Sequence, residues 1–409
     1  MRILSIAFII LLGFTTSAQK KTQKNLPAVY FPPAHLWEHR SVSLAGFDST
    51  RLQAAIRFAQ DHESKGPRSM ELSQAMSFGK EPFGEGIGPF ADRGDATGLI
   101  IHKGYIIAEW GEPLRVDMTH SVTKSFLSTV VGLAVDHGLI RSAQDTVAHY
   151  MPPVEIYLPG QVNRPAEDLG QTQLLSPFTS THNRTLTWDV LLRQTSDWEG
   201  TLWGKPDWAD RPSANSSEWL TRKRNAPGSV YEYNDVRVNA LALAATCVWR
   251  RPLPEVLRTY VMDPIGASNT WRWYGYRNSW IVLDGQAVQS VSGGGHWGGG
   301  MFINAYDMGR FGLLTLNQGN WNGRQLISRE WIQQSLTPTS AQPTYGYMNF
   351  FLNTDKKYLS SAPATAFVHV GNGTNIIYVD AENELVMVVR WIENNAINEM
   401  VKMVLEAKK

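Results

Sequence analysis

A serine and a lysine three residues apart, Ser121 and Lys124, are the residues of this sequence best placed to do chemistry. They open an apolar segment that the sequence predicts to be a helix as far as His137. Positions i and i+3 share one face of a helix, so the hydroxyl and the amine would lie side by side. The helix dipole also favours negative charge at its first turn. A serine nucleophile needs a base to take its proton and N–H groups near a developing oxyanion, so the pattern predicts a serine hydrolase.

The Ser-x-x-Lys spacing occurs three times in the chain, and only this copy is expected to open a helix with a buried face. Ser17–Lys20 straddles a predicted cleavage site, and Ser77–Lys80 contains a glycine and precedes Pro82, which argues against a helix there. In general a partly desolvated lysine can serve as a base, whereas an exposed lysine stays protonated. Taken alone, the pair at Ser121 fits two interpretations equally well: a nucleophile beside its base, or a capped helix start whose lysine is solvated.

Two later stretches carry groups that could complete such a site. In residues 227–239, a phenol precedes polar side chains at a predicted helix start and could relay a proton; the alternative is an aromatic ring packed under a loop. In residues 368–375, a strand ends in glycine. A ligand could lie close to that backbone, and the N–H of the next residue could face an oxyanion. The alternative is a simple change from strand to turn.

Taken in order, the three stretches resemble the serine β-lactamase and penicillin-binding-protein superfamily, in particular its branch of esterases, D-amino-acid peptidases and 6-aminohexanoate-dimer hydrolases. The resemblance covers roughly residues 97–391, including residues 186–200, the Gly-rich stretch 292–300 and residues 307–312. The motifs in this order are far more specific than any one of them.

The resemblance implies a role for each matching residue. Ser121 would be acylated, and Lys124 and Tyr233 would pass protons. The choice of Tyr233 over Tyr231 rests on the alignment of the motif. The resemblance further implies that residues of the C-terminal strand and of the second motif border the substrate or the oxyanion, namely His369, Gly371, Asn372 and Asp235. In that arrangement, Asn372 would offer its N–H beside that of the nucleophile.

The chain departs from the superfamily in two motifs. The second motif is usually Tyr-x-Asn, but here Tyr233 is followed by Asn234 and Asp235, so an aspartate stands where the asparagine amide is usual. An ionised Asp235 would hold Lys124 protonated and shift the work of the base to Tyr233; Asn239 could instead take part of the role of the missing amide.

The third motif has His369 where true β-lactamases have lysine. A histidine gives no fixed positive charge at neutral pH for a substrate carboxylate, which favours an esterase or amidase over efficient β-lactam hydrolysis.

The pattern of elements predicts an α/β (α+β) fold: a mainly antiparallel sheet flanked by helices, with an inserted all-helical domain, as in β-lactamases and transpeptidases. Strands are expected in a hairpin around residues 102–104 and at residues 375–380 and 385–391. Helices are expected at residues 48–62, 121–137, 186–194, 217–224, 234–250, 254–261, 305–316, 328–334 and 395–409. The predicted parts are a leader region at 19–95 that packs on the core, a catalytic domain at 96–160 and 282–409, and the insertion at 161–281.

Composition excludes several classes of function. The 409 residues, 43% of them hydrophobic, are enough for one large domain or two intimate ones. Lys and Arg number 38 and Asp and Glu number 37, so no basic field exists to attract nucleic acid. Trp198, Trp203 and Trp208 recur every five residues and either wall a cleft or brace an irregular segment.

Other chemistries lack their signatures. The chain has no Gly-x-Ser-x-Gly elbow, no P-loop and no convincing dinucleotide fingerprint, so we expect no α/β-hydrolase and no cofactor. His35 and His39 are four residues apart but lack the glutamate of a zinc-hydrolase helix, so we expect no metal. The expected partner is a small-molecule ester or amide substrate.

Residues 1–18 read as an export signal, with a basic start, an apolar run too short to span a membrane, and small residues for cleavage before Gln19. The alternative is a buried N-terminal helix. The only cysteine, Cys247, cannot form an internal disulfide and is expected in the core. We therefore predict a periplasmic or secreted protein without a stable membrane anchor.

The sequence thus predicts an exported serine hydrolase that cleaves an ester or amide through an acyl-enzyme on Ser121. The alternatives are a D,D-peptidase or weak β-lactamase, and a non-catalytic penicillin-binding-like sensor.

Overall fold

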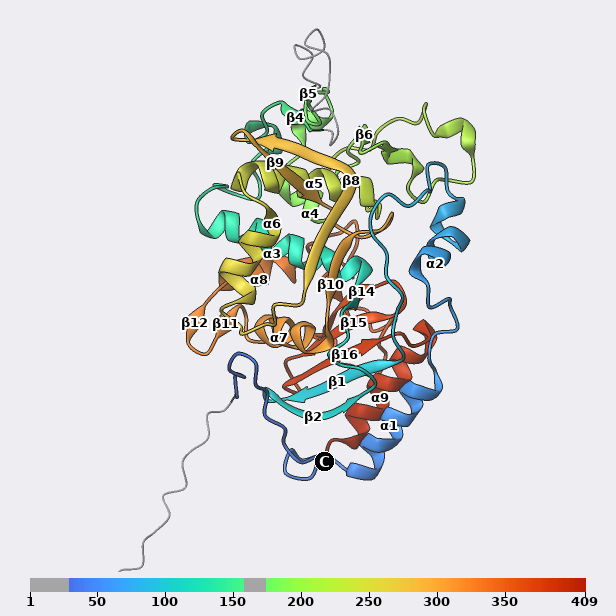
Figure 1. The fold of residues 1–409 in the computed structure, drawn as a ribbon, viewed down its shortest axis with the longest axis vertical. Helices are drawn as coiled ribbons and strands as arrows, with labels where there is room; N and C mark the ends of the chain where they lie inside the picture. The colour runs from blue at the N-terminus through green and yellow to red at the C-terminus, as the bar shows by residue number, and fades with distance from the viewer. Residues whose placement is uncertain (1–28, 158–173) are drawn as a thin grey trace, which may run out of the picture.

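Two large sheets, two short two-stranded sheets and the helices packed around them are found in the part of the chain that the computed structural model describes, residues 29–157 and 174–409 (Figure 1). The predicted signal peptide lies outside these residues. The mixture of helices and antiparallel strands confirms the predicted α/β (α+β) class. Among the described residues, no helix is long and apolar enough to cross a membrane.

The larger sheet joins the two ends of the chain. Its order is β13-β14-β15-β16-β1-β2, and all neighbours are antiparallel. Its strands are β13 (Phe351–Leu352), β14 (Phe367–Gly371), β15 (Asn375–Asp380), β16 (Leu385–Arg390), β1 (Thr97–His102) and β2 (Tyr105–Trp110). Every residue of β1, β15 and β16 is buried, because helices cover both faces of the sheet.

The outer face of this sheet is covered by α1 (Ser49–Asp61) and α9 (Ile397–Ala407), the blue and red helices side by side in Figure 1. The Asp48 side chain caps α1 by accepting from the backbone N–H groups of Thr50 and Arg51. The inner face packs against α7 (Ala305–Leu316). All three helices were predicted from the sequence, and each is confirmed.

Helices α3 (Thr123–Asp136) and α5 (Asp235–Trp249) form the centre of the second region, where they pack against each other. Every residue of α3 from Thr123 to Ala134 is buried, as is typical of a helix enclosed by protein on all sides. Around them lie α4 (Trp188–Leu192), α6 (Leu253–Leu257), α8 (Arg329–Ser335) and a smaller sheet. That sheet comprises β3 (Asp117–Met118), β10 (Gly300–Ile303), β8 (Arg272–Leu283), β4 (Val154–Ile156) and β5 (Leu174–Leu175), with β9 (Gln286–Val291) paired to β8.

Three local expectations are corrected. The predicted insertion is not all-helical, because it also contains β5, β6 (Thr201–Leu202), β7 (Lys205–Pro206) and most of β8. Only a 3-10 turn, Ser216–Glu218, forms where a helix was expected at 217–224, since Leu220 is exposed and gives that segment no buried face. Ser77–Lys80 was not expected to be helical, but Phe78–Lys80 forms a 3-10 turn after α2 (Met70–Met76).

The N-terminal segment crosses the molecule as a strap, here defined as residues 81–90. The N–H groups of Ile87 and Gly88 both donate to the Trp297 carbonyl, at 3.0 and 2.9 Å. Lys205, with only 1% of its side chain exposed, donates to the Glu85 carbonyl at 2.9 Å and pairs with the Glu85 carboxylate at 2.9 Å. The strap is therefore fixed to the Gly-rich loop, residues 293–300, and to the β6–β7 hairpin.

Arg390 links the two sheets from a fully buried position. Its guanidinium donates to Asn375 Oδ1 at 2.7 Å within the large sheet. It also donates to the carbonyls of Ile303 on β10 at 2.7 Å and Met118 on β3 at 2.9 Å. Burial lowers the pKa of Arg390 to about 10, which still leaves it charged at neutral pH.

We expect Arg390→Met to lower the free energy of unfolding by about 3 kcal/mol, because two buried carbonyls and an amide lose a charged donor. Urea denaturation followed by circular dichroism measures the loss. The matched control is Arg272→Met, which removes an exposed arginine that also bonds two carbonyls, those of Asn269 and Trp271. Equal losses in the two variants would contradict the linking role of Arg390.

Candidate active site

The predicted nucleophile lies on a 3-10 turn, His120–Val122, that leads directly into α3. Ser121 is partly exposed, whereas Thr123 is buried. The Thr123 hydroxyl donates to the His120 carbonyl at 2.6 Å and accepts from the Met301 N–H at 2.9 Å. His120 has a φ of +48°, a conformation that is strained for a residue with a side chain. The surrounding structure therefore holds the turn that presents Ser121.

Lys124 lies directly beneath this serine. Its side chain is 0% exposed, and its ammonium Nζ donates to Ser121 Oγ at 3.0 Å and to Asp235 Oδ1 at 2.7 Å. The spacing of three residues thus brings hydroxyl and amine into contact. Because α3 and α5 begin side by side, the same ammonium also meets the first residue of α5.

The Gly-rich loop closes one side of this pair. A Cβ atom on Gly294 would overlap both Asp235 Oδ1 and Lys124 Nζ. The Gly293 N–H donates to Asn239 Oδ1 at 2.9 Å, and Asn239 Nδ2 donates to the Tyr276 hydroxyl at 3.1 Å. The amide of Asn239 is therefore used to fix the loop, not to replace the asparagine that the second motif lacks.

Tyr233 lies against the same ammonium. Lys124 Nζ is 4.6 Å from the centre of the Tyr233 ring. Burial and then the charge of Asp235 raise the pKa of Tyr233, while the charge of Arg211 and a hydrogen bond with Ser121 act in the opposite direction. Both Tyr231 and Tyr233 pack against the Tyr345 ring, with centroids 5.0 and 6.5 Å away, but only Tyr233 also contacts Lys124. The geometry therefore favours Tyr233 as the phenol of the site.

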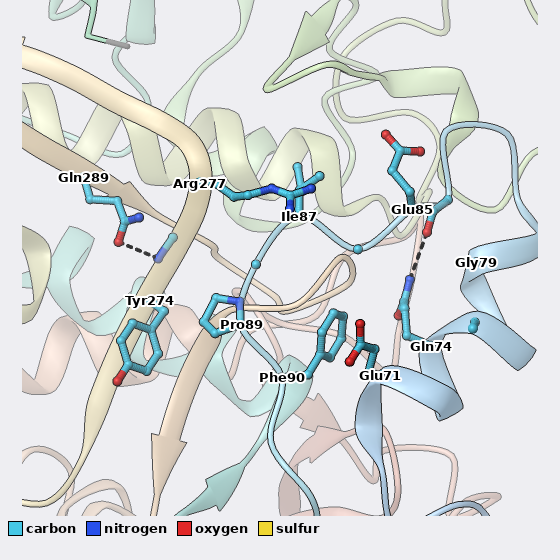
Figure 2. Close-up of a pocket in the computed structure, with 15 residues that line it drawn as sticks. Glu71, Gln74, Gly79, Glu85, Ile87, Pro89, Phe90, Tyr274, Arg277 and Gln289 are labelled. Atoms are coloured by element: carbon cyan, nitrogen blue, oxygen red, sulfur yellow. Dashed lines mark hydrogen bonds between the residues drawn. The ribbon is translucent and has the colours of Figure 1, made fainter. Parts of the chain in front are cut away.

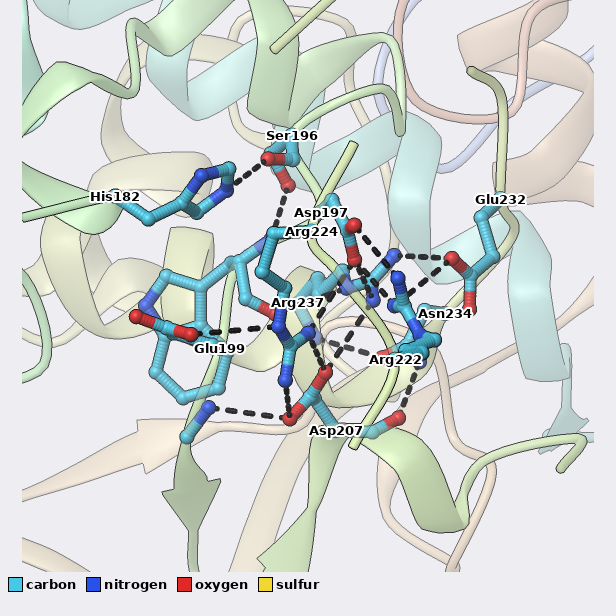
Figure 3. Close-up of polar contacts among 12 residues, drawn as sticks. His182, Ser196, Asp197, Glu199, Asp207, Arg222, Arg224, Glu232, Asn234 and Arg237 are labelled. Atoms are coloured by element: carbon cyan, nitrogen blue, oxygen red, sulfur yellow. Dashed lines mark hydrogen bonds and ion pairs between the residues drawn. The ribbon is translucent and has the colours of Figure 1, made fainter. Parts of the chain in front are cut away.

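A buried cluster of ion pairs supports the segment that carries Tyr233 (Figure 3). Arg237, in the first turn of α5, donates to Asp197 Oδ1 at 2.7 Å. Arg222 donates to Asp197 Oδ2 at 2.8 Å, and Arg224 to Asp197 Oδ1 at 3.3 Å. Arg222 and Arg224 come from residues 217–224, where a helix was expected, and their side chains reach inward to the Asp197 carboxylate, which is 3% exposed.

Gln194 fixes the backbone on both sides of Tyr233. The Glu232 N–H donates to the Gln194 carbonyl at 2.9 Å, and the Asn234 N–H donates to Gln194 Oε1 at 2.7 Å. The Asn234 side chain then caps α5 by accepting from the Arg237 N–H at 3.1 Å. The phenol is therefore positioned by its two neighbours, which explains why an irregular segment can hold it.

Asp235 is surrounded by charged groups. Its Oδ1 accepts from Lys124, and its Oδ2 accepts from Arg211 Nη1 at 3.0 Å and lies 3.8 Å from His296 Nδ1. Its backbone N–H donates to Asp210. Burial alone would raise the pKa of Asp235, but the charges of Lys124 and Arg211 hold it well below its ordinary value. Asp235 is therefore ionised at neutral pH.

One group of side chains next to Asp235 has the donors of a metal site. Oxygen and nitrogen atoms of Glu81, Asp210 and His296 lie within 4.8 Å of one another. Arg211 is bonded to Asp210, and His296 Nε2 is 2.8 Å from Glu81 Oε2. A bound cation would compete with the positive charge of Arg211, so the donor set fits a network of hydrogen bonds better than a metal. The absence of a metal remains a prediction.

His369 lies in the core rather than at the surface of the site. Its side chain is fully buried, its Nδ1 is 2.8 Å from Ser125 Oγ, and its ring packs against Phe311, Phe350 and Phe367. Burial lowers its pKa to about 3, so the ring is neutral at physiological pH. The expectation that its side chain borders the substrate is corrected: the ring supports α3 from below.

Gly371 brings β14 against the nucleophile turn. A Cβ atom at this position would overlap the Thr119 carbonyl and lie 3.3 Å from the Ser121 nitrogen. The close approach therefore requires glycine. Asn372, the next residue, is exposed at the end of the strand. The oxyanion role of its N–H stays a prediction.

Sequence reasoning missed four polar side chains near Asp235: Glu81, Asp210, Arg211 and His296. Only His296 lies in a stretch with a visible signal, the run of glycines that predicts a tight loop. The other three come from the leader region and from an irregular segment, and no spacing in the sequence connects them to Asp235.

Two other predicted features are placed by the structure. Trp198 and Trp203 are buried, and Trp208 stacks on Trp219 with centroids 5.0 Å apart, so these rings brace an irregular segment. Cys247 is buried on α5, as expected.

A pocket of about 600 Å³ lies between the strap and β8 (Figure 2). Its lining includes Glu85, Phe90, Tyr274 and Arg277, but not Ser121, so it is separate from the surface of the nucleophile.

The fold and this arrangement define a class, the serine hydrolases that use a serine and a lysine on one helix start beside an antiparallel sheet. The family model described as Beta-lactamase matches residues 115–391, which is more than half of the chain. The chain therefore belongs to the Beta-lactamase family.

Among curated proteins, the chain is similar to a 6-aminohexanoate-dimer hydrolase of Paenarthrobacter ureafaciens, with 25% identity over 254 residues. The match covers 60% of this chain and 57% of that enzyme.

Solved structures share the fold. A putative 6-aminohexanoate-dimer hydrolase from Bacillus anthracis superimposes with a TM-score of 0.55 and 14% identity, over 92% of this chain and 88% of that one. A family VIII carboxylesterase gives a TM-score of 0.54 and 15% identity, over 88% of this chain and 99% of that one.

We expect Gly294→Ala to lower kcat/KM about 100-fold, because the new methyl group displaces the Lys124–Asp235 pair by a fraction of an ångström or more. Steady-state hydrolysis of an activated ester measures the loss. The control is Gly66→Ala, whose Cβ would meet its nearest atom, Ser64 Oγ, at 3.6 Å. Full activity in Gly294→Ala would show that the loop does not constrain the pair.

Stability should fall as pH falls below about 6.5, because the unfolded chain binds a proton to His369 there and the folded chain does so only near its pKa of about 3. The slope is about 1.4 kcal/mol per pH unit for one such group, or about 2 kcal/mol between pH 6.5 and 5. We expect His369→Gln to lose about 2 kcal/mol less than the wild type over this interval in urea titrations.

The exposed His149 provides the control, because His149→Gln should lose as much stability as the wild type between pH 6.5 and 5. His102 and His120 are also buried with a pKa lowered to about 4, so the variant of His369 retains part of the acid sensitivity.

Proposed function

We propose that the protein cleaves an ester or amide through an acyl-enzyme on Ser121, with Lys124 and Tyr233 as its proton-transfer partners. The observation that carries the proposal is the contact between Ser121 Oγ and the fully buried Lys124 Nζ at 3.0 Å. A partly exposed hydroxyl on a buried amine is the arrangement that a nucleophile with an adjacent base requires.

In the first step, Ser121 Oγ attacks the carbonyl carbon of the substrate and gives up its proton to the Lys124–Tyr233 pair. The bond to the leaving group breaks, and the same pair returns the proton to the departing alcohol or amine. Water then attacks the acyl-enzyme and frees Ser121. The N–H groups of Ser121 and Asn372 are the proposed donors to the oxyanion.

Two observations support an ester or amide that is not a β-lactam. The neutral, buried His369 offers no fixed cation where β-lactamases have a lysine. The similarity to a 6-aminohexanoate-dimer hydrolase points toward a linear amide. A D,D-peptidase or weak β-lactamase is the second candidate, and a sensor that is acylated without turnover is the third.

We also propose that the protein is exported to the periplasm or secreted. The basic start, short apolar run and small residues of the first eighteen positions support this, as does a chain whose only cysteine is buried.

We expect Ser121→Ala to abolish hydrolysis, with a fall in kcat/KM of about 10⁴-fold or more, and Lys124→Met and Tyr233→Phe to lower it by about 10²- to 10⁴-fold. A panel of linear esters, linear amides, D-amino-acid peptides and β-lactams gives the substrate class, and mass spectrometry after exposure to a fluorophosphonate locates the adduct.

The matched control is Ser77→Ala, because Ser77 belongs to another Ser-x-x-Lys match but is exposed. A stable adduct on Ser121 without turnover indicates a sensor. No labelling and no hydrolysis anywhere in the panel would refute the catalytic proposal.

A further inference from the structure

Asp235 is shared between two cations, one at each oxygen. Lys124 Nζ donates to Oδ1 at 2.7 Å, and Arg211 Nη1 donates to Oδ2 at 3.0 Å. The side chain of Asp235 is 1% exposed, so water does little to screen either contact. Whether Lys124 is protonated therefore depends on how strongly the Asp235 carboxylate interacts with Lys124 and how strongly with Arg211.

A lone anion at this position would work against catalysis by Lys124. An opposite charge within about 4–6 Å favours the charged form of a group and shifts the pKa of that group by about 1–3. An unshared Asp235 would thus hold the ammonium in its protonated form, and it would also oppose ionisation of Tyr233, whose ring lies 4.6 Å from Lys124 Nζ. A base is then hard to generate at neutral pH, whichever of the two residues supplies it.

We propose that Arg211 is a positioning residue that neutralises Asp235 and thereby sets the pH at which the Lys124–Tyr233 pair can accept the proton of Ser121. The inference rests on the proposed function of that pair. Asp235 and Arg211 together carry almost no net charge and still accept a hydrogen bond from Lys124. The asparagine amide of the usual Tyr-x-Asn motif would have the same two properties.

Arg211 is built to carry a permanent charge at this place. Its guanidinium carbon lies 5.0 Å from the centre of the Tyr233 ring and 5.3 Å from that of Phe78. The side chain of Arg211 is 34% exposed, and these two rings shield part of the remainder from water. Its pKa is held above its ordinary value by Asp210 and Asp235, against the effect of burial, so it stays charged throughout any assay.

The other charged groups around Asp235 do not replace Arg211. Asp210 is a carboxyl group bonded to Arg211, and burial raises its pKa, so it cannot supply a cation to Asp235. His296 Nδ1 is 3.8 Å from Asp235 Oδ2, which is beyond hydrogen-bond distance, whereas Arg211 Nη1 is at 3.0 Å.

Two further titratable side chains lie near this carboxylate. Burial raises the pKa of Tyr276 to a value well above neutrality, and burial lowers the pKa of His120 to about 4. Both are therefore uncharged at neutral pH, and Arg211 is the permanent cation opposite Lys124 among the described residues that face Asp235.

The experiment measures the rate constant for fluorophosphonate labelling of Ser121 as a function of pH, in full-length wild type, Arg211→Met, Asp235→Asn and the double variant. The midpoint of the acid limb reports the pKa of the base. We expect it to rise by about one unit in Arg211→Met and to fall by about one unit in Asp235→Asn. The double variant loses one charge of each sign, so its midpoint should return close to that of the wild type.

Arg211→Lys keeps the charge and should hold the wild-type midpoint, which a purely structural role would not predict. Arg141→Met removes an exposed arginine paired with Asp145 at 2.8 Å and should leave the midpoint unchanged. If Arg211→Met fails to fold, Asp235→Asn and Arg211→Lys still decide the question, because a lowered midpoint in the first and a wild-type midpoint in the second are predicted separately, and the opposite result in either overturns the inference.

An unchanged midpoint in Arg211→Met, or a double variant that keeps the midpoint of Asp235→Asn, overturns the inference while labelling of Ser121 persists. Failure of the proposed function is a different result: the wild type is then not labelled at Ser121 at any pH, and the inference falls with it.

Discussion

The buried contact between Lys124 and Asp235 is the constraint on which the rest of the site depends. Two charges removed from water cost several kcal/mol each unless their hydrogen bonds are complete. The fold meets this demand by starting α3 and α5 side by side, so that Lys124 from one first turn meets Asp235 from the other at 2.7 Å. Gly294 is glycine for the same reason, because a methyl group there would occupy the space of the pair.

Around the site, buried titratable side chains are either paired with an opposite charge or held neutral. Beneath α3, where no counter-ion is available, His369 is held neutral among aromatic rings. Behind the Tyr233 segment, Asp197 is paired with arginines, and these hydrogen bonds and charges lower its pKa to about 2 although burial alone would raise it. At the centre, Asp235 has a cation on each oxygen. A site of this kind tolerates little change in any single charge.

Much of the fold and the heart of the site follow from local patterns. The apolar stripe predicted α1 and the amphipathic pattern predicted α9, and the Ser-x-x-Lys spacing placed a hydroxyl on an amine because i and i+3 share a helix face. What could not be predicted depends on contacts between distant segments. Arg211 reaches Asp235 from 24 residues away, and nothing periodic in either segment records that contact. His369 fits its strand pattern equally well on either face, and only packing decides that it lies in the core.

The family match begins at residue 115, yet the segments packed around the Lys124–Asp235 pair extend further toward the N-terminus. The strap donates two N–H groups to the Trp297 carbonyl, and the adjoining loop places Gly294 against Lys124 and Asp235. Glu81, at the start of the strap, pairs with His296, whose other nitrogen faces Asp235. A displacement of the strap would therefore affect the Lys124–Asp235 pair in two ways. It would shift the backbone of the Gly-rich loop, and it would change the Glu81–His296 contact next to Asp235. The working unit of this hydrolase thus includes part of its leader region as well as the matched domain.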